Sequence, residues 1–139
     1  MIAEQLAHTH KLAFTDSRAW SADEFATLLI QKTTLAVGNA DCFILGRVHL
    51  DEAEILTLAT SPKFQRQGRA KAALQDFLTQ IAANGVTTVF LEVAADNEAA
   101  LGLYQKNGFK QVGLRKGYYR RAHQAACDAI VLQLTLPQR

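Results

Sequence analysis

The stretch that decides the fold is Ile55–Val93, ILTLATSPKFQRQGRAKAALQDFLTQIAANGVTTVFLEV. Residues 55–60 are apolar or β-branched and end at Ser61-Pro62, which predicts a strand. A polar loop follows, and then apolar residues at helical spacing predict a helix that ends at Asn84-Gly85; they are Leu74, Phe77, Leu78 and Ile81. The run Val86–Val93 predicts a second strand. Two strands joined through a helix imply a parallel pair.

The flanking sequence predicts further strands and helices on both sides of this unit. Ser21, with Glu24 three residues later, is a capping box that predicts a helix with an apolar stripe at Phe25, Leu28 and Leu29. Other helices are expected over 2–13 and, capped by Asp96 or Asn97, up to Asn107-Gly108. Strands that pair as hairpins are expected over 34–37, 42–50, 109–114 and 129–136. The fold class is therefore α+β, with a mixed, mostly antiparallel central sheet.

The composition is that of one folded domain. The chain has 139 residues, of which 49% are hydrophobic, and a formal net charge of +2, so we expect a single domain over 1–139 and no direct nucleic-acid partner. A local basic cluster is interpreted first as a solvated rim around a loop; it comprises Arg115, Lys116, Arg120 and Arg121. No segment resembles a signal peptide or a membrane span, which favours a cytoplasmic protein without a membrane partner.

The cysteines and histidines do not predict a metal site. Cys42 and Cys127 lie far apart, each in an apolar run, and we expect both to pack in the core in a reducing compartment. His8 and His10 are two residues apart, a spacing that points two side chains in different directions from a helix.

A phosphate-binding loop is predicted between the first strand and the helix of Ile55–Val93. A helix N-terminus offers unpaired backbone N–H groups and a partial positive charge. The small residues Gly68 and Ala70 would let an anion approach the backbone, and Arg66, Arg69 and Lys71 add positive charge. The loop therefore suits a pyrophosphate or similar anion, although such a basic helix start is equally often plain solvated surface. It matches neither a Gly-Lys-Ser/Thr phosphate loop nor a dinucleotide Gly-x-Gly-x-x-Gly motif.

Glu92 is the only charged residue in the strand Val86–Val93. Alternation places it on the face opposite to Val89, Leu91 and Val93. If helices cover both faces, the carboxyl group enters apolar surroundings, which would raise its pKa toward neutrality and suit a general base. The alternative is that Glu92 lies at the strand's end in contact with water.

Tyr104 lies in the helix predicted to end at Asn107, on the face shared with Ala100 and Leu101. A buried tyrosine normally finds a hydrogen-bond partner for its hydroxyl while the ring packs. By itself, Tyr104 is therefore explained equally well as a packing residue.

Taken together, these residues resemble the GNAT acetyltransferase superfamily. The shared motifs are Gln65-x-x-Gly68-x-Ala70, Leu91-Glu92-Val93, Asn97, Ala100, Leu103-Tyr104 and Gly108-Phe109. Other features are similar to its RimI-type branch, which acetylates the N-terminal alanine of ribosomal proteins; they are Trp20-Ser21, Asp51-Glu52-Ala53, Tyr118-Tyr119 and Asp128-Ala129. The resemblance extends from about Ala13 to Leu136 and implies a sheet with one splayed parallel pair and helices on both faces.

The resemblance also implies acetyl-CoA as the co-substrate and no metal. Backbone groups of Leu58, Ala59 and Thr60 would bind the acetyl and pantetheine part, and Asn97 would hydrogen-bond the pantetheine arm. Backbone amides of the loop would hold the pyrophosphate; its residues are Arg66, Gln67, Gly68, Arg69, Ala70 and Lys71.

For the reaction itself, the resemblance implies that Glu92 accepts a proton from the incoming ammonium, through water, and that Tyr104 protonates the departing thiolate. Tyr118 or Tyr119 would line the acceptor groove. A peptide α-amine, with a pKa of about 7.7–8.0, is deprotonated near neutrality far more easily than lysine at about 10.4. In agreement with this, the resemblance implies that the acceptor is a protein N-terminus, in particular the N-terminal alanine of a small-subunit ribosomal protein; we expect a monomer or weak dimer.

Two alternatives remain at this point. One is the same fold acting on a lysine side chain, a polyamine or an antibiotic, although the basic cluster argues mildly against a polyamine. The other is a non-catalytic module that senses acyl-CoA, which could lose Glu92 and Tyr104; the sequence has both.

Three features depart from the family pattern. Ala70 stands where the branch often has glycine, a change that the wider superfamily tolerates. The chain begins almost directly in its first helix, whereas the family commonly has a strand before it, so the strand over 34–37 is expected to be an exposed edge. The loop from Arg120 to Ala126 is unlike the family and leaves the exact acceptor open.

Overall fold

A computed structural model describes residues 1–14, 19–119 and 126–137 of the chain. Its α-helices are α1 (Ala3–Ala13), α2 (Ala22–Leu29), α3 (Arg69–Ala83) and α4 (Glu98–Lys106), with a short 3-10 helix at Pro62–Phe64. Its strands are β1 (Thr34–Asn39), β2 (Cys42–His49), β3 (Glu52–Thr60), β4 (Thr88–Ala94), β5 (Lys110–Tyr119) and β6 (Cys127–Thr135). None of the described helices is both long and apolar enough to cross a bilayer.

The helices begin and end where local chemistry predicts. The capping box of α2 is formed, because Ser21 Oγ accepts from the Glu24 N–H and Glu24 Oε1 accepts from the Ser21 N–H. The turn after α3 uses Gly85 at a φ of 86°, and that after α4 uses Gly108 at 96°. Asn97, rather than Asp96, is the N-cap of α4.

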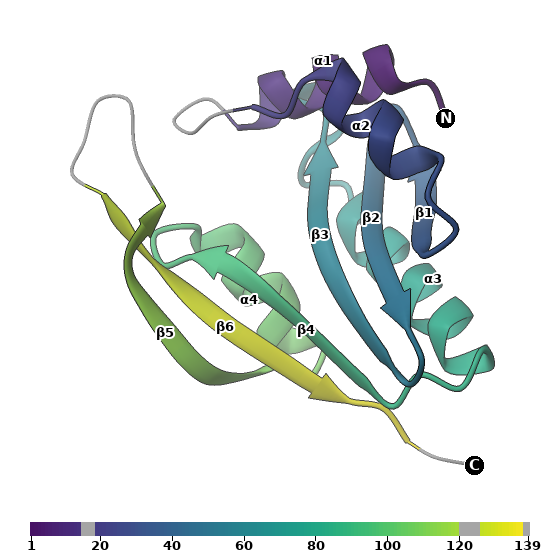
Figure 1. Ribbon diagram of the computed structural model, residues 1–139. Coiled ribbons are helices and arrows are strands. Elements are labelled where there is room, and N and C mark those ends of the chain that lie inside the picture. The colour runs from purple at the N-terminus through teal and green to yellow at the C-terminus, as the bar shows by residue number, and fades with distance from the viewer. Residues whose placement is uncertain (15–18, 120–125, 138–139) are drawn as a thin grey trace.

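The strands form one mixed sheet in the order β1-β2-β3-β4-β6-β5 (Figure 1). Its neighbouring strands are antiparallel except for β3 and β4, which run parallel. The predicted mostly antiparallel sheet with one parallel pair is therefore confirmed. Strand β1 is an edge strand, as expected for the segment 34–37.

The parallel pair is short because β3 carries an extra residue. Its register with β4 ends at Ile55 opposite Leu91, and the two strands then diverge (Figure 1). On the other side of β3, Leu45 pairs with Thr57 but Gly46 pairs with Ile55, which leaves Leu56 without a partner on β2. Such a bulge bends a strand and increases its twist. The predicted splay is confirmed, and the bulge is its physical cause.

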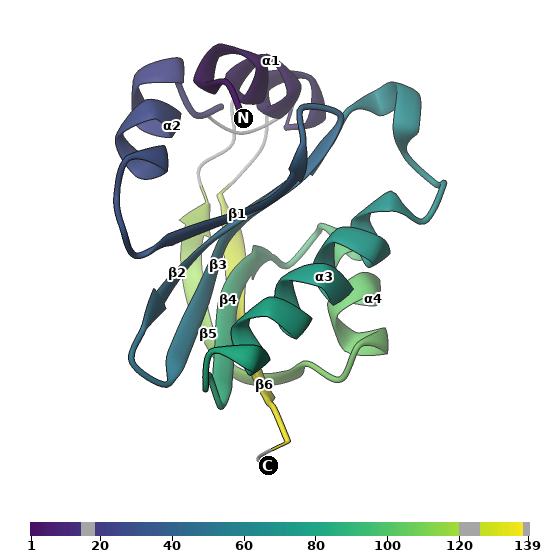
Figure 2. The same ribbon diagram turned by 90° about the vertical axis from the view of Figure 1, so that its right-hand side faces the viewer.

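Helices cover both faces of the sheet, as the resemblance implied (Figure 2). The larger core lies between the sheet and helices α3 and α4, and its fully buried members include Ile44, Leu74, Phe77, Ile81 and Val89. The smaller core lies between the sheet and helices α1 and α2; its buried members are Leu6, Phe25, Phe43, Leu45 and Ala59.

Histidine 10 belongs to the smaller core. His10 is buried, its Nδ1 accepts the Trp20 N–H, and its ring stacks on those of Phe14 and Trp20. His8, by contrast, is exposed. The two side chains therefore point in different directions from α1, as their spacing predicted, and His10 serves to join α1 to the chain that leads into α2.

The structure corrects several details of the sequence-based expectations. Strand β5 continues to Tyr119 instead of ending at Leu114, so Tyr118 and Tyr119 lie on a strand. Glu52 belongs to β3, and the turn before it is formed at Leu50 and Asp51, with Leu50 at a φ of 56°. Cys42 is buried as expected, but Cys127 is only half-buried, because β6 begins with it near the rim of the sheet.

Gly46 offers a test of the packing beside the bulge. An added Cβ would lie within 2.6 Å of Phe77 Cε2 and 3.0 Å of the Glu54 carbonyl oxygen. Because the Phe77 ring is fully buried, it has no room to move aside. We expect Gly46→Ala to lower the free energy of unfolding by about 1–3 kcal/mol, measured by urea denaturation. The control is Gly102→Ala in α4, where a Cβ meets nothing within 4 Å and should raise helix stability by up to about 1 kcal/mol. Equal effects of the two substitutions would contradict this account of the bulge.

Candidate active site

The splay between β3 and β4 exposes part of one strand's backbone. Beyond Ile55, β3 keeps its pairing with β2 but has no pairing with β4. Backbone N–H and C=O groups that lose a strand partner must be satisfied by other groups or by a ligand. Leu58, Ala59 and Thr60, the residues predicted to bind the acetyl and pantetheine part, lie on this segment.

The predicted phosphate loop opens α3 with free backbone amides. Gly68 is the N-cap, with a φ of 77° and no side-chain cap. The first helical hydrogen bond runs from the Ala72 N–H to the Gly68 carbonyl, so the N–H groups of Arg69, Ala70 and Lys71 have no helical partner. A Cβ added at Gly68 would meet nothing within 4 Å. The helix start is therefore open to an anion.

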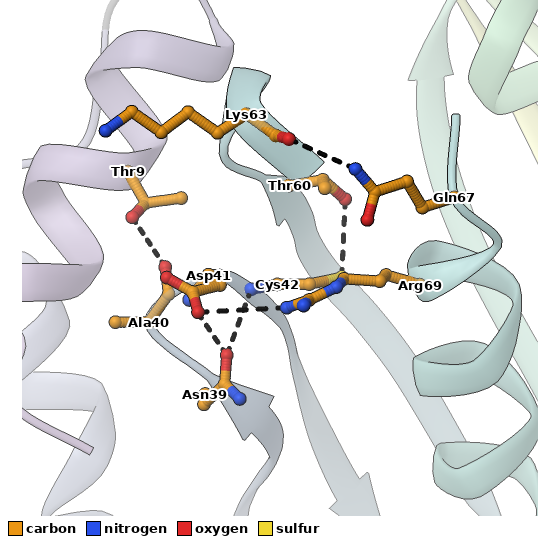
Figure 3. Close-up of polar contacts among 9 residues, drawn as sticks. All are labelled: Thr9, Asn39, Ala40, Asp41, Cys42, Thr60, Lys63, Gln67 and Arg69. Atoms are coloured by element: carbon orange, nitrogen blue, oxygen red, sulfur yellow. Dashed lines mark hydrogen bonds and ion pairs between the residues drawn. The ribbon is translucent and has the colours of Figure 1, made fainter. Parts of the chain in front are cut away.

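The turn between β1 and β2 braces this loop (Figure 3). Asp41 Oδ2 lies 3.7 Å from Arg69 Nη1, and the Asp41 carbonyl oxygen accepts the Ser61 N–H at 2.7 Å. The guanidinium carbon of Arg69 also lies 4.1 Å from the centroid of the Phe64 ring. Arg69 is thus held against the turn by its side chain, while its backbone N–H remains at the helix start.

Two glutamine side chains close the loop on itself. Gln65 Nε2 donates to the Thr60 carbonyl, and Gln67 Nε2 donates to the Lys63 carbonyl, each at 3.2 Å. The first bond ties the loop to the end of the splayed strand. Within the described part of the chain, Arg66 and Lys71 form no ion pair and are exposed, so they are the cations left to meet an anion.

Glu92 is not buried in apolar surroundings; of the two interpretations that the sequence left open, the structure agrees with contact with water. Its side chain retains 25% exposure, and Glu92 Oε1 accepts a hydrogen bond from Arg115 Nη1 at 2.8 Å. The helices on its side of the sheet, α1 and α2, pack on β1 and β3 and leave β4 uncovered there. Glu92 therefore lies on the open part of the face, with a charged partner.

Tyr118 and Tyr119 lie close to the Glu92–Arg115 pair; that they line an acceptor groove stays a prediction. The Tyr118 ring is 4.0 Å from the Arg115 guanidinium carbon and stands edge-on to the Tyr119 ring, with centroids 5.3 Å apart. The Tyr119 hydroxyl donates to the backbone carbonyl of Glu92 at 3.2 Å. Gly117, at a φ of 61°, donates its N–H to Asp128 Oδ1 and fixes the irregular end of β5 that presents both rings.

Tyr104 lies on the α3 and α4 side of the sheet, opposite to the face that carries the Glu92 side chain. Its ring packs against Phe109 in the larger core and is 5% exposed. Burial raises the pKa of Tyr104 well above its ordinary value, and the nearby Tyr119 hydroxyl raises it further. Among the described residues, only the Thr34 hydroxyl is both fully buried and unpartnered. The Tyr104 hydroxyl also has no hydrogen bond to another described residue. Since it is not among the fully buried, unpartnered atoms, it must be accessible to solvent.

Asn97 has a structural duty in addition to its predicted one. Its Oδ1 accepts the Ala100 N–H at 3.2 Å as the N-cap of α4. The capping bond uses the amide oxygen and leaves the Nδ2 donor available, which is the group that the predicted bond to a pantetheine arm would need.

The predicted site residues gather into two groups. One group comprises the splayed strand and the loop, joined through Gln65; the other comprises Glu92, Tyr118 and Tyr119. Tyr119 links the second group to Tyr104, since it contacts the Glu92 backbone and contributes to the raised pKa of Tyr104. No cluster of three or more potential metal ligands occurs in the described ranges.

Sequence reasoning missed two partners in these groups. Arg115 was assigned to a solvated basic rim, yet it holds the Glu92 carboxylate; Arg120 and Arg121 of that rim, and most of the loop 120–126, lie outside the described residues. Asp41, the partner of Arg69, had no signal at all, because the pairing depends on a turn that is distant in sequence.

Comparison with known proteins supports the same interpretation. Residues 3–109 match the model of the Acetyltransferase (GNAT) family. The [Ribosomal protein bS18]-alanine N-acetyltransferase of Escherichia coli K12 is 36% identical over 99 residues, which cover 71% of this chain and 66% of that protein, slightly less than two thirds. The enzyme of the same name from Haemophilus influenzae is 31% identical over 93% of this chain and 85% of its own length.

The fold is shared with a solved structure. The crystal structure of the ribosomal-protein-S18-alanine N-acetyltransferase from Escherichia coli superposes with a TM-score of 0.88 at 30% identity, covering 99% of this chain and 89% of that one. The resemblance inferred from the sequence motifs is confirmed by these matches.

The raised pKa of Tyr104 predicts a loss of stability at alkaline pH. The folded state holds the Tyr104 proton more tightly than the unfolded chain, so this stabilisation is complete below pH of about 10 and is lost as pH rises further. The free energy of unfolding should therefore fall relative to that of Tyr104→Phe by about 1.4 kcal/mol per pH unit above that point. Urea denaturation of both proteins from pH 7 to 11 measures the difference. A difference in the free energy of unfolding that stays constant over this range would refute the raised pKa of Tyr104.

Proposed function

The chain belongs to the GNAT acetyltransferase family, and on that premise we propose that it transfers an acetyl group from acetyl-CoA to the α-amine of a protein N-terminus. The observation that carries the proposal is the unpaired edge of β3 after Ile55, which leads directly into the loop that opens α3. An extended, polar co-substrate fits such an edge because it can replace the missing strand.

Acetyl-CoA would be held mainly by backbone groups. The edge of β3 at Leu58, Ala59 and Thr60 offers N–H and C=O groups to the acetyl and pantetheine part. The N–H groups of Arg69, Ala70 and Lys71 meet the pyrophosphate at the positive end of the α3 dipole. Gly68 and Gln67 shape this loop, and the exposed Arg66 adds charge. The Nδ2 group of Asn97, whose Oδ1 caps α4, would donate a hydrogen bond to the pantetheine arm.

Glu92 would act as the base. Its Oε1 is held by Arg115, whereas Oε2 has no partner among the described residues and can accept a proton from the acceptor ammonium, directly or through water. The freed lone pair then attacks the thioester carbon, so that a C–N bond forms and the C–S bond breaks. Holding the two reactants in line supplies much of the acceleration.

Tyr104 would act as the acid. The hydroxyl keeps its proton throughout the neutral range, as tyrosine ordinarily does, and would give it to the departing sulfur. The second proton of the amine, released as the amide forms, restores Tyr104 through solvent. Overall, an ammonium and a thioester become an amide, a thiol and one proton.

The acceptor class follows from the relatives and from the chemistry of amines. The E. coli and H. influenzae relatives are named for the alanine of ribosomal protein bS18. A protein N-terminus has a pKa of about 7.7–8.0, so it is deprotonated near neutrality far more easily than lysine at about 10.4. We therefore propose the N-terminal alanine of a small-subunit ribosomal protein as the acceptor.

Mass spectrometry on a mixture of acceptors tests this function. The protein is incubated with acetyl-CoA, peptides beginning with Ala, Ser, Met or Gly, a blocked peptide with an internal Lys, and spermidine. Acetylation of the α-amine of the Ala peptide, ahead of the other acceptors, is the expected result. Modification of only lysine or spermidine would keep the reaction but reject the acceptor. Absence of any product, with coenzyme binding intact, would reject the proposal in favour of a sensing module.

The role of Glu92 predicts a characteristic pH dependence. Glu92→Gln keeps the size and hydrogen bonding of the side chain but removes the base. We expect kcat/KM for the Ala peptide to fall most at pH 6, where few α-amines are already neutral, and least at pH 9. Steady-state kinetics across this range measures the ratio of variant to wild type. A loss of equal size at every pH would assign Glu92 a positioning role instead.

A further inference from the structure

Arg115 reaches Glu92 across an intervening strand. Glu92 is on β4 and Arg115 on β5, with β6 between them. Arg115 pairs with Ala129, which pairs with Ala94, two residues from Glu92, so both side chains project from the same face of the sheet. The small side chain of Ala129 leaves space for the long arginine to pass over β6 and bring its Nη1 to 2.8 Å from Glu92 Oε1.

The guanidinium of Arg115 is a permanent positive charge at this point. Arginine does not lose its proton in proteins, and here the hydrogen bond to Glu92 raises its pKa further. The Tyr118 ring, 4.0 Å from the guanidinium carbon, holds the group from a second side. The side chain remains 52% exposed, so its charge also acts on whatever approaches Glu92 from solvent.

We propose that Arg115 determines specificity by disfavouring acceptors that arrive as cations. This inference rests on the proposed function, in which the acceptor amine meets Glu92. An ammonium placed at Glu92 lies close to a like charge, whereas a neutral amine does not. At pH 8 about half of α-amines are neutral, but only about one lysine side chain in 250 is. The same arginine therefore penalises lysine and polyamines more than a protein N-terminus.

The other ionisable groups around this pair do not supply the discrimination. Tyr118 and Tyr119 face it from β5, and Asp128 on β6 is engaged with the Gly117 N–H. Lys116 is also exposed on β5, but it is the neighbour of Arg115 in the strand and has no ion pair with Glu92. Replacing Lys116 by a neutral residue changes the net charge by the same amount as replacing Arg115, so Lys116 serves as a matched control.

The test compares two peptides of the same sequence, one with a free N-terminus and no lysine, the other with a blocked N-terminus and one lysine. We expect Arg115→Gln to raise the ratio of kcat/KM for the lysine peptide to that for the α-amine peptide by up to about fivefold at pH 8, chiefly through KM. That factor corresponds to about 1 kcal/mol, the interaction of two unit charges 4 Å apart in water. At pH 6, where both acceptors are cations, the variant should change the two peptides equally.

Two variants separate charge from packing. Arg115→Lys keeps the charge and should keep the wild-type ratio, and Lys116→Gln should leave the ratio unchanged at both pH values. If Arg115→Gln has too little turnover to measure, calorimetric Kd values of the two peptides in the presence of CoA give the same ratio. An unchanged ratio in Arg115→Gln at pH 8, or an equal change in Lys116→Gln, would overturn the proposal. Failure of the wild type to acetylate the α-amine peptide would instead reject the underlying function.

Discussion

The site depends on one irregularity, the extra residue Leu56 in β3. Without it, β3 and β4 could continue as a parallel pair, and the backbone beyond Ile55 would be used within the sheet. The bulge bends β3 away and frees that edge for a ligand. Gly46 pairs with Ile55 beside the bulge and lets the Phe77 ring pack directly on the strand. The structure thus places its weakest pairing where a co-substrate can take the place of a strand.

The bulge also reverses which side chains face which core. Before it, Ala53 and Ile55 belong to the core under α3 and α4; after it, Ala59 belongs to the core under α1 and α2, although all three are an even number of residues apart. The end of β3 is therefore fixed from both faces while its edge stays free. The Asp41–Arg69 pair and the Gln65 bond then hold the start of α3 at the end of that strand. A stiff frame around an unpaired edge is what positioning of a flexible co-substrate requires.

Local rules predicted the elements well, because each depends on residues close in sequence. The capping box at Ser21 and Glu24 and the apolar spacing in α3 are confirmed, and the strand predicted over Val86–Val93 is observed over Thr88–Ala94. Alternation could not predict that the side chains of β3 change faces after Leu56. Nor could it predict the pairing of β5, whose register with β6 shifts twice. The sequence predicts that this strand ends at Leu114, but pairing with β6 sustains it to Tyr119 despite the glycines at 113 and 117, which weaken a strand pattern.

The environment of Glu92 shows why the chemistry of a site is harder to predict than its fold. A lone carboxylate in an apolar strand leaves burial and contact with water both open, and the outcome depends on groups that are distant in sequence. The sheet's face is bare at that point, and Arg115 reaches the carboxylate across β6. Under the proposed function, a neutral amine approaches this carboxylate without repulsion from the guanidinium, whereas an ammonium meets a like charge there. The group that holds the proposed base would therefore also select among the amines that reach it.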